Sequence, residues 1–275
     1  MAQAADTERT DRSEESERRA RAHEVRRQVA VATRMLVDAG ILGYSGHLSA
    51  RAPGDERLYI QPVDDSRASL RPERVLLVSF DGEVVEGKGK PPSELPIHAE
   101  LYRARPDVGA VAHFHHDPTT MFTMVEHGAI VPVKNHASRW ADGVPVHPDA
   151  SHIATAEQGR ALAATLGGAA AALLRGHGEV VVAEDVLTLF ADVVHFVENA
   201  DALAHAMQLG RVVPLGREEC DRFLATFRRD RHARKLWNHH ASVALGSGSI
   251  LPEWLDAEAA PADRGAPARS LRGSR

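Results

Sequence analysis

Three histidines lie close together in the segment AHFHHDPTT, which spans residues 112–120 and contains an Asp-Pro step. The alternating pattern leading into this step predicts a β-strand, in which successive side chains point to opposite faces. His113 and His115 would then project from one face and could reach a single divalent ion, whereas His116 would point away. Two histidines packed beneath a helix would give the same pattern, so the pair needs further ligands before it indicates a metal site.

Further candidate groups occur on both sides of that segment. Glu94 and His98 are four residues apart in a predicted helix, so they share a face, and a carboxylate suits the first turn. His177 stands between two glycines after an apolar strand, and His47 lies in the glycine-punctuated segment GYSGHLS. An ordinary helix start or an exposed tight turn would explain each of these residues equally well.

The composition excludes several classes of function. The chain has 275 residues, of which 43% are hydrophobic and 26% charged, and this composition is typical of a globular protein. A net charge of −5 argues against nucleic-acid binding, although arginines cluster in FRRDRHARK. The lone Cys220 excludes an internal disulfide, and its charged surroundings give no sign of thiol catalysis. Because we find neither a membrane-spanning stretch nor a signal sequence, we expect a cytoplasmic protein.

The domain organisation predicted from the sequence is one folded unit between two tails. Residues 1–20 and 256–275 are rich in charged or small residues and are expected to be disordered, leaving one folded domain over residues 21–245. Within it we expect helices over residues 22–40, from a Ser93 cap to Pro106, from an Asp117 cap to 128, and over 155–168, 185–210 and about 217–240.

Strands are predicted between those helices. Asp81-Gly82 is a strong turn signal between two apolar runs and predicts an antiparallel hairpin. Further strands are expected over residues 108–116, 129–134, 143–147 and, as a strand–turn–strand unit, 170–185. Helices alternate with strands while hairpins are also present, which indicates a mixed sheet with helices on its faces.

The order of these segments resembles the class II aldolase/adducin family. The resemblance rests on the segments GHLSAR, PPSELPIHAELYRARPDVGAVAHFHH and LLRGHG, and it covers about residues 22–210. In that family the corresponding motifs run G-N-x-S, P-S-S-E with a His four residues beyond the Glu, H-x-H, and N-H-G. The resemblance implies an α/β fold, the three-layer α/β/α class II aldolase-like fold with a mixed central β-sheet, and a homotetramer.

The resemblance also implies the roles of the candidate residues. His113, His115 and His177 would bind a divalent metal ion, zinc in typical aldolases, with manganese or iron as alternatives. Three neutral imidazoles leave the ion its charge and an open coordination position, as a Lewis acid requires. Glu94 would be the general acid/base beside the metal, and His47 is a second catalytic candidate.

Departures from the family pattern bear on the substrate. Pro92 replaces the first Ser of P-S-S-E and leaves only Ser93, His47 replaces the Asn of G-N-x-S, and Gly176 replaces the Asn before the last histidine. The sequence also lacks the T-P-S-G turn that helps sugar-phosphate aldolases bind phosphate. Because a phosphate dianion needs such hydroxyls and amides, a sugar phosphate is an unfavourable substrate.

The segments GHxS and RGHG instead resemble a branch of the family that contains decarboxylases of aromatic and pyridine dicarboxylic acids, of which dihydroxyphthalate decarboxylase is one. His47 and Arg175 would hold a substrate carboxylate. The further substrate-binding candidates are Ser93, His98, His116, Lys134 and Arg139, of which His98 and His116 also compete with Glu94 as proton donor.

We therefore expect a metal-dependent carboxy-lyase that decarboxylates a hydroxylated aromatic carboxylic acid. One alternative is an aldehyde-lyase acting on an unphosphorylated hydroxy-oxo acid or sugar. Another is a mononuclear iron oxygenase on the same scaffold, because histidine and carboxylate ligands also suit Fe(II). A binding or cytoskeletal module, as in the adducin branch, is disfavoured because the metal ligands are retained here.

Overall fold

A single mixed β-sheet forms the centre of the computed structural model, which describes residues 2–54 and 56–255. Within those residues the sheet has eight strands in the order β4-β3-β2-β1-β5-β8-β7-β6. Neighbouring strands are antiparallel except β6 and β7, which are parallel. The strands are β1 (His47–Arg51), β2 (Arg57–Ile60), β3 (Leu76–Ser79), β4 (Val84–Glu86), β5 (Ala110–Phe114), β6 (Val146–His147), β7 (Ala171–Leu174) and β8 (Gly178–Ala183).

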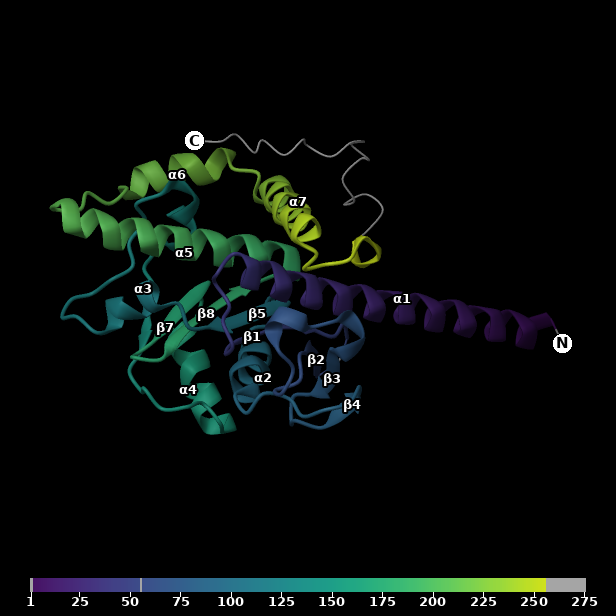
Figure 1. Cartoon of the computed structure of the whole chain (residues 1–275). Helices are drawn as coiled ribbons and strands as arrows, with labels where there is room; N and C mark the ends of the chain where they lie inside the picture. Colours follow the sequence, from purple (N-terminus) through teal and green to yellow (C-terminus); the bar gives the residue numbers. More distant parts are fainter. Residues whose placement is uncertain (1, 55, 256–275) are drawn as a thin grey trace, which may run out of the picture.

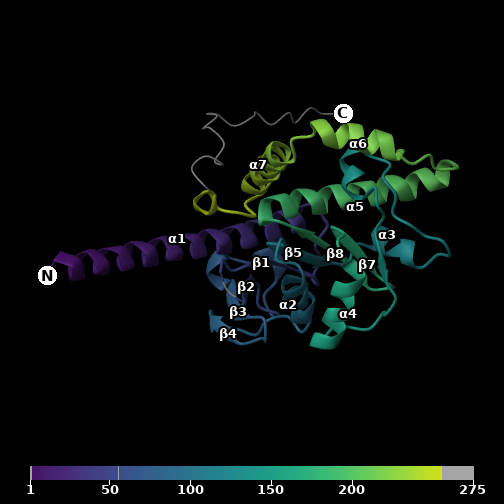
Figure 2. The ribbon, with the colours of Figure 1, turned by 180° about the vertical axis from the view of Figure 1, so that it is seen from behind.

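Helices cover both faces of this sheet. Figure 1 shows α5, α6 and α7 on one side and α2 and α4 on the other, and Figure 2 shows the same layers from behind. The three-layer α/β/α architecture predicted from the sequence is therefore confirmed. The helices are α1 (Ala2–Asp38), α2 (Leu95–Ala104), α3 (Asp117–Thr120), α4 (Ala156–Leu166), α5 (Val186–Leu209), α6 (Arg217–Thr226) and α7 (Arg229–Ser247).

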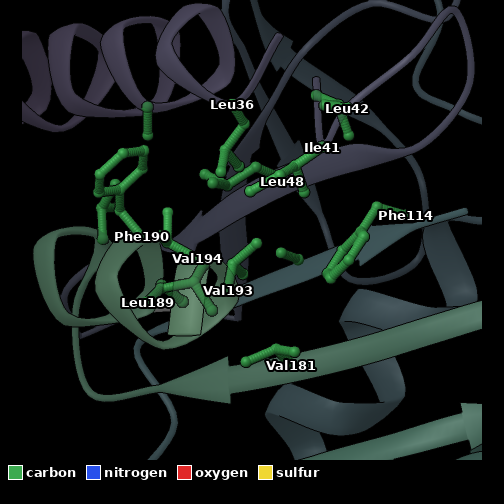
Figure 3. Packing of buried hydrophobic residues seen from close by; sticks show 14 of the residues in the cluster. Leu36, Ile41, Leu42, Leu48, Phe114, Val181, Leu189, Phe190, Val193 and Val194 are labelled. Atoms are coloured by element: carbon green, nitrogen blue, oxygen red, sulfur yellow. The ribbon is translucent and has the colours of Figure 1, made fainter. Parts of the chain in front are cut away.

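Two hydrophobic cores follow from the alternation of the strands. In β5, Ala110, Ala112 and Phe114 belong to the core under α1, α5 and α7, whereas Val111 belongs to the core under α2 and α4. Figure 3 shows the first core close up, where side chains of α5 meet those of β8, β1 and α1; among them are Leu189, Phe190, Val193, Val181, Leu48 and Leu36. The predicted alternation of this strand is confirmed, and it directs His113 toward α2.

Several local signals in the sequence act as predicted. The hairpin about Asp81-Gly82 joins β3 to β4, with Gly82 at φ +95°. Thr155 caps α4 in a capping box, accepting a hydrogen bond from the Gln158 amide. Asp185 caps α5 by accepting from the Thr188 amide, and the helix ends before Gly210. No helix of the described residues is both long and apolar enough to cross a membrane.

The structure differs from the predicted boundaries at the two ends of the chain. Residues 2–20 form part of α1 rather than a disordered tail, and Figure 1 shows the N-terminal half of this helix extending beyond the sheet. This segment has no Gly or Pro and is rich in Ala, Glu and Arg, all good helix formers. In place of the single helix predicted over about 217–240, the structure has two helices, α6 and α7, separated by residues 227–228. The predicted tail over 256–275 lies outside the described residues.

Three predictions in the middle of the chain are wrong. Glu94, not Ser93, is the N-cap residue of α2. The expected helix after Asp117 is the short α3, capped by His116 and followed by the 3-10 turn η3 (Met121–Thr123). Residues 129–134 form no strand, because they run along α5, whose Asn199 side chain accepts hydrogen bonds from the backbone amides of Val133 and Lys134. In the last case a contact with a distant segment replaces the local preference.

Close packing of α2 on α4 sets the position of Glu94 at the start of α2. Gly159 of α4 faces the first turn of α2, and a Cβ at this position would lie 2.5 Å from the backbone oxygen of Pro96. The neighbouring atom belongs to the backbone, so it cannot move aside without shifting α2.

We predict that Gly159→Ala destabilises the protein by about 1–3 kcal/mol, as overpacking does. In an open helix the same substitution would stabilise by up to about 1 kcal/mol. Urea unfolding monitored by circular dichroism measures the difference. Gly168→Ala is the matched control, because a Cβ there meets no atom within 4 Å. A Gly159→Ala protein as stable as the wild type would show that the two helices are not in close contact.

Candidate metal centre

The carboxylate of Glu94 lies at the centre of a group of imidazoles. Glu94 is the N-cap residue of α2, yet its side chain makes no capping hydrogen bond to the helix and turns toward the sheet instead. Its Oε2 lies 3.3 Å from Nε2 of His113, and its Oε1 lies 3.5 Å from Nε2 of His177. The backbone amide of Ile153 donates to Oε1 at 3.2 Å, which helps to satisfy this buried carboxylate.

His113 and His115 come from the end of β5, as the alternation predicts. His113 is fully buried, and its Nδ1 hydrogen-bonds to the backbone oxygen of Glu179 on the adjacent β8 at 3.0 Å. That bond fixes the tautomer with the proton on Nδ1 and leaves Nε2 as a free ligand atom. His115 follows the last residue of β5, and its Nε2 lies 3.0 Å from Nε2 of His113.

His177 is placed by the tight turn between β7 and β8. Its backbone amide donates to the oxygen of Leu174, and the preceding Gly176 has a φ of +61°, which favours glycine. The following Gly178 passes against β5, where a Cβ would lie 2.5 Å from the oxygen of Phe114. The two glycines therefore allow the imidazole of His177 to reach within 5.0 Å, ring centre to ring centre, of both His113 and His115.

This group of residues fits a divalent metal ion. Glu94, His113, His115 and His177 each offer a ligand atom, and these atoms lie within 4.8 Å of one another. Nδ1 of His177 is buried and has no hydrogen-bond partner among the described residues. Three imidazoles with a neighbouring carboxylate are the donor set of catalytic zinc sites, which retain an open position for substrate. His113, His115 and His177 would hold the ion, with Glu94 beside it.

A chain of buried hydrogen bonds extends from this centre toward α2. His47 lies opposite His113 in the register of β1 and β5, with its Nε2 3.8 Å from Oε2 of Glu94. Its Nδ1 hydrogen-bonds to Nε2 of His98 at 2.7 Å, and Nδ1 of His98 bonds to the Ser49 hydroxyl at 2.6 Å. The hydroxyl of Tyr102 closes the chain at 2.8 Å from Ser49.

Burial keeps most of these imidazoles neutral. Burial lowers the pKa of His47 to about 4, against a smaller opposing effect of Glu94, and it lowers the pKa of His98 well below its usual value. The pKa of His177 is also lowered, by burial and then by His113. Burial alone would raise the pKa of Glu94, but the neighbouring imidazoles of His113, His47 and His177 outweigh it and hold that pKa well below its usual range. Neutral imidazoles and an ionised carboxylate are the forms that bind a metal ion.

The predicted substrate-binding residues fall into two groups. Ser93 hydrogen-bonds to Nε2 of His152 at 2.9 Å and so lies at the centre. Arg175 is exposed on the turn that carries His177, with Nη1 3.4 Å from the oxygen of Pro148. His98 is fully buried behind His47, so it faces another side chain rather than open space.

The other group is not brought to Glu94. His116 points away as predicted, with Nδ1 2.8 Å from the Thr119 hydroxyl and Nε2 3.6 Å from Asp201 of α5. Lys134 pairs with Glu198 at 2.8 Å, and Arg139 pairs with Asp192 at 3.0 Å. These partners also belong to α5, which covers the other face of the sheet.

The structure adds residues that the sequence did not indicate. Nδ1 of His152 lies 3.2 Å from Oε1 of Glu94, but this histidine stands in a loop where no periodicity could place it. Glu179 is fully buried and accepts hydrogen bonds from the backbone amide of His116 and the hydroxyl of Thr120. Ser49 was visible in the GHxS motif, although its contact with Tyr102 was not.

We predict that the stability of the metal-free protein falls as the pH drops from about 6.5 to about 4. Over that range the unfolded chain binds protons that His47, with its folded-state pKa of about 4, does not bind. Each such proton costs up to about 1.4 kcal/mol per pH unit. Urea unfolding of chelator-treated protein across this range should show a shallower slope for His47→Asn, and an unchanged slope for the exposed control His239→Asn. Equal slopes in all three proteins would contradict the assignment of a buried, neutral His47.

Comparison with known proteins identifies the family of the chain. Residues 27–204 match the Class II Aldolase and Adducin N-terminal domain family. The chain is 31% identical to a 5-methylthioribulose-1-phosphate/5-deoxyribulose-1-phosphate aldolase of Rhodospirillum rubrum, over 68% of this chain and 82% of that protein. It is 32% identical to a 3,4-dihydroxyphthalate decarboxylase of Rhodococcus jostii, over 58% of this chain and 70% of that one.

Solved structures show the same fold. An aldolase II superfamily protein from Pseudomonas syringae superposes with a TM-score of 0.72 at 23% identity, covering 82% of this chain and 94% of that one. An L-fuculose 1-phosphate aldolase superposes with a TM-score of 0.67 at 23% identity, covering 74% and 96%. Family match, sequence likeness and fold all agree with the resemblance seen in the motifs. The chain belongs to the class II aldolase and adducin family.

Proposed function

We propose that this lyase of the class II aldolase superfamily uses a divalent metal ion to decarboxylate a hydroxylated aromatic carboxylic acid. The main support for metal dependence is the position of the Glu94 carboxylate, whose oxygens lie 3.3 Å from Nε2 of His113 and 3.5 Å from Nε2 of His177. A divalent ion bound there would act as a Lewis acid toward a substrate oxygen and stabilise the charge that develops when a carbon–carbon bond breaks. Three imidazoles with an open coordination position are a typical ligand set for catalytic zinc, which is therefore the ion that we propose.

The residues around Glu94 support a carboxylate rather than a phosphate as the group recognised. Pro92 has no hydroxyl to offer, and the position that is Asn in the family pattern holds His47, which is buried against Glu94. Arg175 stands exposed on the turn that carries His177. A guanidinium binds a carboxylate through two parallel hydrogen bonds, so Arg175 suits a substrate with a second carboxyl group.

Glu94 has the position to move the proton that decarboxylation needs. Its carboxylate accepts the proton of the substrate's phenolic hydroxyl. The bond from the ring to the carboxylate then breaks, CO2 leaves, and the electron pair stays with the ring carbon. Glu94 returns its proton to that carbon, and water reprotonates the phenolate. His47, 3.8 Å from Oε2, keeps the carboxylate in this position.

An aldehyde-lyase is the second candidate, favoured by the likeness to the Rhodospirillum rubrum aldolase. Both reactions break a carbon–carbon bond and leave an electron pair to be stabilised, so the same centre serves either. An iron oxygenase on this scaffold is a third, which requires dioxygen as co-substrate. The products separate the three.

The test is a product screen with protein stripped of metal and reloaded either with Zn²⁺ under nitrogen or with Fe²⁺ in the presence of dioxygen. The panel contains 3,4-dihydroxyphthalate, other ortho-hydroxylated aromatic acids, unphosphorylated hydroxy-oxo acids and 5-methylthioribulose 1-phosphate. We expect CO2 from an ortho-hydroxylated acid only after metal is restored. Release of an aldehyde instead would favour the second candidate, and turnover only with Fe²⁺ and dioxygen the third.

We predict that Glu94→Gln lowers kcat by about 100- to 10,000-fold, the usual contribution of a general acid/base. Its metal content should equal that of the wild-type protein, because the three histidines are intact. Steady-state CO2 release and elemental analysis measure the two quantities. Glu157→Gln on the exposed side of α4 is the control. Full activity in Glu94→Gln would remove Glu94 from the mechanism.

Arg175→Ala should raise KM by about 10- to 100-fold with a smaller change in kcat, because a charge-assisted hydrogen bond contributes about 1.5–3 kcal/mol to binding. The exposed Arg222→Ala on α6 is the control. Initial rates over a range of substrate concentrations give both constants. An unchanged KM would show that Arg175 does not bind the substrate.

We also propose that the protein is a homotetramer, as the resemblance implies. Met121, Met124 and Val125, on and after the turn η3 near His177, are about half exposed, and apolar side chains of this kind suit a contact between subunits. Sedimentation velocity should give the mass of four chains, and a single-chain mass would refute this assembly.

A further inference from the structure

A second group of histidines lies under the C-terminal helices. His136 comes from the 3-10 segment η4 (Asn135–Trp140), His195 from the middle of α5, and His232 from the first turn of α7. Each offers a ring nitrogen, and these atoms lie within 4.8 Å of one another. The group is on the α5 side of the sheet, whereas His113 and Glu94 face α2, so the two groups are separate.

The three imidazoles are packed closely together. Nε2 of His195 lies 2.9 Å from Nε2 of His232. The ring of His136 stacks on those of His195 and His232, with ring centres 4.4 and 4.5 Å apart. Phe227 of the α6–α7 link packs beside this stack, 5.4 Å from His136 and 5.2 Å from His232.

A hydrogen bond between His195 and His232 does not by itself account for this arrangement. It would satisfy one nitrogen of each ring, but the buried Nδ1 of His195 has no hydrogen bond among the described residues. Oε2 of Glu198 lies 3.5 Å from this Nδ1. A carboxylate behind one nitrogen of an imidazole is the usual support for a histidine that binds metal through its other nitrogen.

Most of the charged side chains around the three histidines form ion pairs. Lys134 pairs with Glu198, and Arg139 and Arg229 both pair with Asp192. Lys235 on α7 is the remaining cation that acts on His232, and Glu184 pairs with Arg229. Burial lowers the pKa of His195 to about 4 and lowers the pKa of His136 and His232, so all three are neutral near pH 7. Neutral imidazoles are the form that binds transition metals.

Space for a fourth ligand adjoins the group. A cavity of about 50 Å³ is lined by all three histidines, together with Asp192 and Phe227 among others. This volume holds a water molecule, which needs about 10–15 Å³. Three imidazoles and one water complete the tetrahedral coordination that Zn²⁺ and Co²⁺ adopt.

We propose that His136, His195 and His232 bind a second divalent transition-metal ion, separate from the Glu94 centre, which ties α7 to α5 and η4. Its role is structural, because it joins three segments that are distant in the sequence. The family match ends at residue 204, so His232 belongs to a segment beyond it. The ion would thus attach the C-terminal helices to the rest of the domain, in addition to the apolar contacts that these helices already make.

The experiment uses His113→Ala/His115→Ala protein as a reporter, because only the second site can then bind tightly. Chelator-treated reporter is titrated with Co²⁺, whose visible absorption is strong in tetrahedral sites, and with Zn²⁺ followed by elemental analysis. We expect one ion per chain. Adding His232→Gln to the reporter should weaken binding by more than about 100-fold, since even supporting residues of metal sites contribute 10- to 100-fold.

His239→Gln, an exposed histidine on the same helix, is the matched control and should leave binding unchanged. Thermal unfolding gives a second readout, in which Zn²⁺ raises the Tm of the reporter and of the control but not of the His232→Gln protein. A reporter that binds no ion at micromolar Co²⁺ or Zn²⁺, or a His232→Gln reporter that binds as tightly as its parent, would overturn the proposal. Wild-type protein should bind two ions per chain, and loss of activity at the Glu94 centre would leave this second ion in place.

Discussion

The buried carboxylate of Glu94 is the constraint on which the rest of the site depends. A carboxylate with so little contact with water is costly unless it is paired, and here it is surrounded by His113, His177, His47 and the amide of Ile153. These partners come from different parts of the chain. The fold must therefore bring two strands, a tight turn and a helix start together to within 4 Å of one side chain.

Each structural layer contributes one part of that arrangement. The register of β1 against β5 sets His47 opposite His113, and the glycines of the β7–β8 turn bring His177 to the same edge of the sheet. Packing of α2 on α4 positions the carboxylate above these rings. The opposite face of the sheet, under α5 and α7, carries the second histidine group. The two faces thus hold two distinct sets of imidazoles in one chain.

Much of the site follows from local rules, and the remainder depends on contacts between distant segments. Strand alternation alone separates His113 from His116, and the order of the motifs selects Glu94 and His177 from sixteen histidines and many more carboxylates. Local rules could not show that His98 contacts His47, because that contact depends on strand register and helix docking. They also misplaced Lys134 and Arg139, whose positive charge suits a substrate but is paired with carboxylates of α5. The helical N-terminus was missed because charge-rich composition was taken to indicate disorder, although the same residues favour a helix.

The most direct measurement of the central claim is anomalous diffraction at the zinc absorption edge, from crystals of metal-stripped protein reloaded with Zn²⁺. The account predicts an anomalous peak bonded to Nε2 of His113 and to the rings of His115 and His177, with the carboxylate of Glu94 beside it. An ordered site with no anomalous signal between these three histidines would contradict the assignment of this cluster as the metal centre of a lyase.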